Sequence, residues 1–127
     1  MMTAITTIDG RLTANPDLRF IPSGDARVSF TVAYSKRKFD KATNTWSNDG
    51  DPIFLDVVAW KQLAEGAADQ LERGSTVIVT GELQQRNWEK DGQKRSKIEL
   101  VAKEIGLSVR SRKPQNSAQE PEQQVAW

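Results

Sequence analysis

Apolar and polar residues alternate along residues 26–35, and this two-residue period constrains the fold more than any other feature of the chain. Val28, Phe30, Val32 and Tyr34 fall on one side of an extended chain, whereas the residues between them are largely polar. Successive side chains of a strand point to opposite faces of a sheet. The pattern therefore predicts a strand with one buried face.

Four further segments have strand character: residues 3–14, 53–60, 75–89 and 94–105. The first is rich in β-branched residues, and its Gly10 predicts a bulge or a bend. Asp91-Gly92 separates the last two segments and is typical of a tight hairpin turn. Residues 15–25 indicate mostly turn with a short extended piece. The polar residues 36–52 indicate either a protruding hairpin or a loop.

One helix is predicted, over residues 61–74. Leu63, Ala67 and Leu71 recur at the spacing of a helical stripe, and Gly74 is suited to end the helix. Five strands with one short helix between the third and the fourth is the element order of an OB-fold. We therefore predict an all-β fold, a five-stranded Greek-key barrel, while β-sandwiches and other small barrels stay open as alternatives.

The length and composition predict one domain and a tail. Residues 1–110 are expected to form the domain, and residues 111–127, mostly Gln, Pro, Ser and Glu, to form a disordered tail. The chain has no cysteine, which fits a reducing compartment, and no histidine, the commonest general base and metal ligand. No apolar run approaches the roughly 20 residues that span a bilayer, and the N-terminus lacks secretory features. We expect a cytoplasmic protein without cofactor, metal or membrane contact.

Two basic clusters are hidden in a formal net charge of +1. Residues 36–41 carry four cations and one acid around Phe39, and residues 86–97 carry five cations and two acids around Trp88. A run of cations is most often a solvated surface, but each of these clusters also carries an aromatic ring. The combination indicates a surface that contacts an anionic partner with flat apolar groups.

The alternation along two strands assigns further aromatics to the same kind of surface. In residues 53–60 the aliphatic set Ile53, Leu55, Val57 and Ala59 is expected in the core, which leaves Phe54, Asp56, Val58 and Trp60 on the other face. In residues 77–89 Val77, Val79 and Leu83 point one way and Gln84, Arg86 and Trp88 the other. If both strands share a sheet, rings and cations share one surface. Unpaired bases stack on such rings, and phosphates need such cations.

We therefore predict a non-enzymatic protein that binds single-stranded nucleic acid without sequence preference. The predicted base-stacking residues are Phe54, Trp60 and Trp88, with Phe39 as a weaker contact. The predicted phosphate contacts are Lys36, Arg37, Lys38, Arg86, Lys94 and Arg95.

Other interpretations of the same residues stay open. Exposed rings on strands also pack across strands or bury against proteins, as in a protein-interaction module or a replisome accessory subunit. Trp46 is interpreted as a loop-packing residue rather than a ligand contact. A metal-dependent nuclease would need Asp49, Asp51 or Asp56, and these acids are more simply turn residues.

Several motifs together resemble the bacterial single-stranded DNA-binding protein family: "GRLTANPDLRF" (10–20), "DKATNTW" (40–46), "FLDVVAWKQLAE" (54–65) and "RNWEKDGQKR" (86–95). The resemblance implies an OB-fold, usually a homotetramer, that coats single-stranded DNA in replication, recombination and repair. Phe54, Trp60 and Trp88 match the base-stacking positions of the family. Phe39 lies one residue from a further stacking position, which Lys38 occupies.

The C-terminal part also bears on the resemblance. "VAKEIGLSVRSR" (101–112) is similar to members from high-GC Gram-positive bacteria, in which an added edge strand clamps neighbouring subunits. The family usually ends in a long linker and an acidic tip that recruits other proteins, whereas this chain ends "EPEQQVAW". We therefore do not expect ordinary partner recruitment. A short-tailed paralogue or a phage-borne member fits the pattern.

Overall fold

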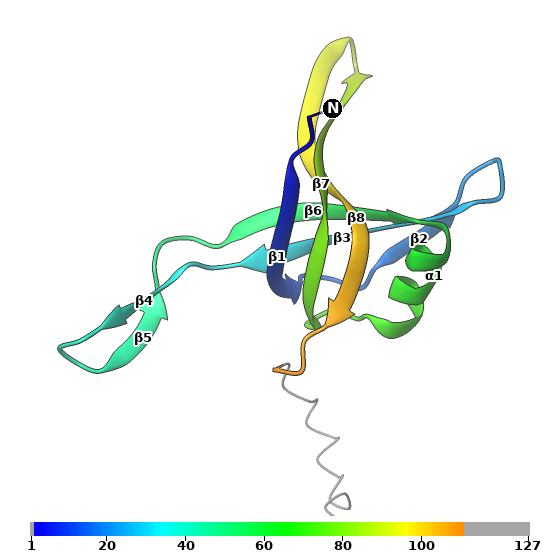
Figure 1. The fold of residues 1–127 in the computed structure, drawn as a ribbon. Helices are drawn as coiled ribbons and strands as arrows, with labels where there is room; N and C mark the ends of the chain where they lie inside the picture. Colours follow the sequence, from blue (N-terminus) through cyan, green and yellow to red (C-terminus); the bar gives the residue numbers. More distant parts are fainter. Residues whose placement is uncertain (1, 111–127) are drawn as a thin grey trace, which may run out of the picture.

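The computed structural model describes residues 2–110 and is mostly β-structure with one short helix (Figure 1). The predicted tail, residues 111–127, lies outside the described residues. In chain order the elements are β1 (Ile5–Leu12), β2 (Asp17–Phe20), β3 (Ala26–Tyr34), β4 (Arg37–Asp40), β5 (Thr45–Asn48), β6 (Ile53–Trp60), α1 (Lys61–Gln70), β7 (Thr76–Lys90) and β8 (Gln93–Leu107).

Six of the strands form one sheet in the order β1-β7-β8-β6-β3-β2. All neighbours are antiparallel except β6 and β8, which run parallel. β1 pairs with β7 along most of its length and with β3 at Arg11 and Leu12. A Cβ on Gly10 would lie 2.4 Å from the carbonyl oxygen of Ala33, so the glycine predicted to bend this strand is the point at which β3 comes close.

The β7–β8 and β4–β5 hairpins extend from the body of the molecule (Figure 1). β7 and β8 continue beyond the sheet to a two-residue turn at Asp91 and Gly92, whose φ values of 52° and 76° are the left-handed geometry that an Asp-Gly turn supplies. β4 and β5 form the second hairpin as a separate two-stranded sheet. Residues 36–52 are thus a protruding hairpin rather than a loop.

The core is built from the side chains that alternation assigned to it. Val28, Phe30 and Val32 of β3 are buried, as predicted, and Val77, Val79 and Leu100 pack in the same cluster. α1 closes one side of the core with Ala64 and Ala67, which are small enough to let the helix approach the sheet.

Three details of the sequence interpretation are wrong. Ile53 is exposed because it lies where β6 leaves the sheet toward the hairpin, and Val58, assigned to the outer face, is buried. The helix ends at Gln70 rather than beside Gly74. Leu71 is already extended, and Gly74 donates a backbone hydrogen bond to the carbonyl of Leu12, which draws the chain back to β1.

All five predicted strand segments contain a strand, and the helix lies between the third and fourth of them. The short strands β2, β4 and β5 are additional. Among the described residues, the single helix is too short and too polar to be a candidate for crossing a membrane.

The close approach of β7 and β8 at Gly81 gives a test of the packing. A Cβ at Gly81 would lie 2.1 Å from the carbonyl oxygen of Val101, beside the register shift between the two strands. We expect Gly81→Ala to lower the free energy of unfolding by about 1–3 kcal/mol, because backbone must move to accept the methyl group. Urea denaturation measures this change.

Gly106→Ala is the matched control on β8. Nothing lies within 4 Å of a Cβ at Gly106, so this substitution should change the stability by less than about 0.5 kcal/mol. Equal changes in the free energy of unfolding from the two substitutions would contradict the close pairing of β7 and β8 at Gly81.

Candidate nucleic-acid interface

Strand register places the three predicted stacking residues on one face of the six-stranded sheet. Asp56 of β6 is the pairing partner of Glu99 of β8, and Glu99 is the partner of Gln84 of β7. Paired residues point to the same side of a sheet, and every second residue along a strand does likewise. Phe54 and Trp60 therefore share a face with Arg86 and Trp88. We call this surface the aromatic face; its members on β3, β6, β7 and β8 are Arg27, Thr31, Phe54, Asp56, Trp60, Arg86, Trp88, Arg95, Lys97 and Glu99.

The rings of the aromatic face lie outside the core cluster. Phe54 is 61% exposed and Trp60 39% exposed, while Trp88 is half-buried. Large apolar side chains gain free energy by burial, so rings left in water on a well-packed sheet mark a surface that a partner covers. The three rings are neither packed in the core nor spread over different faces of the sheet.

Two of the rings are in contact with a guanidinium group. The Cζ atom of Arg27 lies 5.7 Å from the centroid of Trp60, its cross-strand partner. The Cζ atom of Arg86 lies 4.5 Å from the centroid of Trp88, two residues along the same strand. Both distances are within the range of cation–π attraction. Each tryptophan is thereby held by a neighbour on the aromatic face.

Two ion pairs lie between the aromatic residues. The Nζ atom of Lys97 donates to a carboxylate oxygen of Asp56 at 2.6 Å, and the other oxygen of Asp56 accepts from Thr31 at 2.7 Å. The Nε atom of Arg86 lies 3.4 Å from Glu99, a carboxylate that is only 7% exposed. These charges line one hollow of about 350 Å³. Two of the basic residues between 86 and 97 are therefore already neutralised.

The environment of Asp56 lowers its pKa. Burial acts in the opposite direction, since it disfavours the charged form. The hydrogen bonds from Lys97 and Thr31, together with the positive charges of Lys97 and Arg86, outweigh burial and bring the pKa below 3.8. Asp56 is therefore a carboxylate at neutral pH and holds Lys97 in place.

Five of the six predicted phosphate contacts are exposed and make no ion pair with residues 2–110: Lys36, Arg37, Lys38, Lys94 and Arg95. Arg95 is the cross-strand partner of Trp88, and Lys94 is its neighbour in the same hairpin. Trp88, Lys94 and Arg95 line an open hollow of about 600 Å³. Glu89 lines the same hollow and is the cross-strand partner of Lys94. The β7–β8 hairpin thus brings a ring and two exposed cations together.

The β4–β5 hairpin carries the other predicted residues away from the main sheet. Phe39 is the cross-strand partner of Trp46, and the centroids of the two rings are 5.2 Å apart. Trp46 therefore packs against a ring of the same hairpin but stays 59% exposed. Alternation places Arg37 on the same side as Phe39 and Lys38 on the opposite side. The structure does not join Phe39 to the three rings of the aromatic face.

The acids considered for a metal site are not grouped. Asp49 and Asp51 follow β5 and are exposed, whereas Asp56 is bonded to Lys97 and Thr31. Within residues 2–110 no three metal-binding side chains of the His, Cys, Asp or Glu type are gathered.

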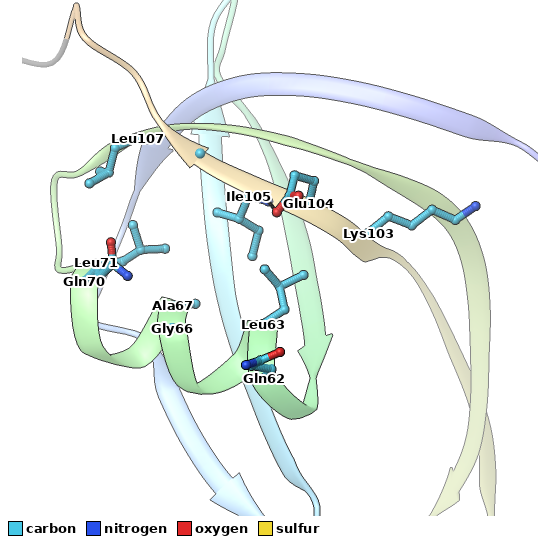
Figure 2. A pocket seen from close by; sticks show the side chains of 11 residues that line it. Gln62, Leu63, Gly66, Ala67, Gln70, Leu71, Lys103, Glu104, Ile105 and Leu107 are labelled. Carbon is cyan, nitrogen blue, oxygen red and sulfur yellow. Dashed lines mark hydrogen bonds between the residues drawn. The ribbon is translucent and has the colours of Figure 1, made fainter.

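Another hollow lies away from the predicted site. Figure 2 shows it between α1 and the end of β8, with Leu63 and Leu71 facing Ile105 and Leu107. Its volume is about 560 Å³, and none of its lining residues is aromatic or belongs to the predicted site. It offers neither a stacking surface nor a group of uncompensated cations.

Sequence reasoning missed Arg27, Lys97 and Glu99. Alternation alone assigns Arg27 to an outer face, but its contact with Trp60 depends on the register between β3 and β6. The pairing of Lys97 with Asp56 likewise depends on which strands are neighbours. The order of the strands in the sheet, which no local pattern gives, decides the contacts of Arg27 and Lys97. Arg86 and Glu99 lie in one hairpin, so the register set by the predicted Asp91-Gly92 turn could have indicated their pairing.

The chain is similar to proteins with one common description. The model of the "Single-strand binding protein family" matches residues 4–108. The single-stranded DNA-binding protein of Mycolicibacterium smegmatis is 49% identical over 105 residues, which make up 82% of this chain and 63% of that protein. The single-stranded DNA-binding protein of Paenarthrobacter aurescens is 48% identical over 109 residues, 85% of this chain and 63% of that protein.

A solved structure gives the same result. The crystal structure of a small single-stranded DNA-binding protein from Streptomyces coelicolor has a TM-score of 0.73 at 29% identity, and the match covers 87% of this chain and 98% of that one. The relatives come from high-GC Gram-positive bacteria, as the sequence of residues 101–112 predicts. The chain covers 63% of the length of the two curated relatives.

The bonds of Asp56 give a prediction about pH. We expect Asp56→Asn to lower the free energy of unfolding by about 1 kcal/mol at pH 7, because a partly exposed, charge-assisted hydrogen bond to Lys97 is lost. The folded protein holds the pKa of Asp56 below 3.8, so the unfolded chain takes up a proton first as the pH falls. The difference in the free energy of unfolding between the wild type and Asp56→Asn should therefore become smaller as the pH falls through 3.8 and below.

Urea denaturation at a series of pH values measures this difference. Asp51→Asn is the matched control, since the Asp51 carboxylate is exposed and makes no hydrogen bond or ion pair within the described chain. If this difference in the free energy of unfolding grows as the pH falls, Asp56 does not have a lowered pKa in the folded protein.

Proposed function

Since the chain belongs to the single-strand binding protein family, we propose that it binds and coats single-stranded DNA without sequence preference. Bases stack on the rings of the aromatic face, and exposed cations neutralise the phosphates. The process served is DNA replication, recombination and repair, on the nucleoid in the cytoplasm. The protein performs this role by binding, without turnover.

The observation that carries the proposal is the joint position of Phe54, Trp60 and Trp88. They occupy one face of one sheet, outside the core, with guanidinium groups beside two of them. Every base has a flat π-face, so stacking is indifferent to sequence and contributes about 1–3 kcal/mol per base. In duplex DNA these faces are already stacked, so the aromatic face selects unpaired strands.

The phosphates are neutralised by Lys36, Arg37, Lys38, Lys94 and Arg95. These side chains lie on the two hairpins and have no carboxylate partner in residues 2–110. Each neutralised phosphate adds about −0.7 to the slope of log affinity against log salt concentration. Phe39, on the same hairpin as the first three cations, supplies a weaker stacking contact in partnership with Trp46.

We propose that the six-stranded sheet is a five-stranded OB-fold barrel in Greek-key order with β2 as an added edge. The pairings β1–β7, β7–β8, β8–β6, β6–β3 and β3–β1 support this description, because they return to the strand at which they began. The domain comprises residues 1–110. The protein assembles as a homotetramer.

Replacement of one ring tests the proposal. We expect Trp88→Ala to weaken binding to oligo-dT by about 1–3 kcal/mol while the urea midpoint stays close to that of the wild type, because the ring is outside the core. The fluorescence anisotropy of a labelled oligo-dT measures the affinity.

Phe20→Ala is the matched control. Phe20 is 63% exposed, but its pairing partner Ala26 belongs to the core-facing set of β3, so the two surfaces differ. This substitution should leave the affinity unchanged. Equal losses from both substitutions, or none from Trp88→Ala, would remove the aromatic face from the binding site. The rings would then serve a protein-interaction module instead.

A further inference from the structure

We infer that Glu99 is a positioning residue for base stacking at Trp88 and that it acts through Arg86. Glu99 holds the guanidinium group of Arg86 against the indole ring, so Arg86 supports the ring and does not contact a phosphate. The inference rests on the proposed function, and it assigns to Arg86 a role different from that of the other basic residues of the hairpin.

The geometry of three side chains carries this inference. Glu99 is 7% exposed, and its carboxylate oxygen lies 3.4 Å from the Nε atom of Arg86. The Cζ atom of Arg86 lies 4.5 Å from the centroid of the Trp88 ring. The three residues form a chain of contacts. The buried Glu99 contacts the guanidinium group of Arg86, and this group contacts the ring of Trp88.

The burial of Glu99 explains why Arg86 stays with it. If Arg86 moved to a phosphate, it would leave a buried carboxylate without its cation. An unpaired buried carboxylate costs much free energy, whereas one solvent-exposed contact with a phosphate contributes little. Arg95 differs in this respect, because its side chain is exposed and has no acid to leave within the described residues.

The position of Arg86 favours stacking in two ways. The guanidinium group attracts the π-system of Trp88 and holds the ring before any base arrives, so less ordering is needed on binding. The cation also occupies one face of the ring, which directs a base to the face that remains. Both effects depend on Glu99, because an unpaired arginine side chain would be free to leave the ring.

A comparison of two arginines on the same hairpin tests the inference. Arg86→Gln and Arg95→Gln each remove one positive charge beside Trp88. We expect Arg86→Gln to weaken oligo-dT binding about two- to fivefold with an unchanged salt slope, because a cation–π contact is lost. Arg95→Gln should make the slope shallower by about 0.7, because a phosphate contact is lost.

Glu99→Gln tests the chain of contacts. Measured at high salt, where phosphate contacts are screened, Glu99→Gln should also weaken binding about two- to fivefold. The double variant Arg86→Gln/Glu99→Gln should bind no more weakly than Arg86→Gln alone, because both changes remove the same support. If Glu99→Gln does not fold, as urea denaturation would show, the comparison of the two arginines decides alone.

Three results would overturn the inference: a shallower slope for Arg86→Gln like that of Arg95→Gln, unchanged or tighter binding by Glu99→Gln, or independent effects in the double variant. Each of these can occur while the wild type binds oligo-dT and Trp88→Ala weakens that binding. A failure of the proposed function differs, because the wild type would then not bind or Trp88→Ala would have no effect.

Discussion

The pairing of β8 with β6 on one side and β7 on the other determines where every functional side chain of the sheet lies. β8 aligns Glu99 with Asp56 and with Gln84, and this register sends Leu100, Val57 and Leu83 to the opposite face. A shift of one residue between β8 and a neighbouring strand would exchange the two faces of the shifted strand. The buried aliphatic residues therefore hold the aromatic face in place, and the free energy that stabilises the fold also fixes the positions of the rings.

Some charged side chains of the aromatic face form ion pairs with one another, and others do not. Arg86 and Lys97 are paired with Glu99 and Asp56, and these four groups form a neutral cluster between the rings. Lys94 and Arg95 lie further along the β7–β8 hairpin and make no such pair within residues 2–110. In the proposed function, the neutral, ordered charges near the rings keep side chains in one arrangement, while the exposed cations at the hairpins attract the backbone of a nucleic acid. We propose that this division separates stacking from phosphate neutralisation.

Much of this arrangement follows from local patterns in the sequence. Alternation identified β3 and the parity of Trp88, and Asp91-Gly92 identified the turn of the long hairpin. Local patterns failed where the exposure or the contacts of a residue depend on its place in the folded sheet. Ile53 has core parity but lies beyond the packed part of the sheet and is exposed. The count of charges in residues 86–97 did not include Asp56, because Asp56 lies far away in the sequence. In the structure its carboxylate accepts a hydrogen bond from Lys97. The strand order decides such contacts, and no single segment encodes it.

We propose that Phe54, Trp60 and Trp88 form one open surface for unpaired bases. Nuclear magnetic resonance of the indole N–H groups tests it most directly, with Trp→Phe variants to assign each signal. We predict that addition of oligo-dT shifts the signals of Trp60 and Trp88 together, and that duplex DNA of equal length does not. Binding of oligo-dT that leaves both signals in place, or an equal response to duplex, would contradict the claim.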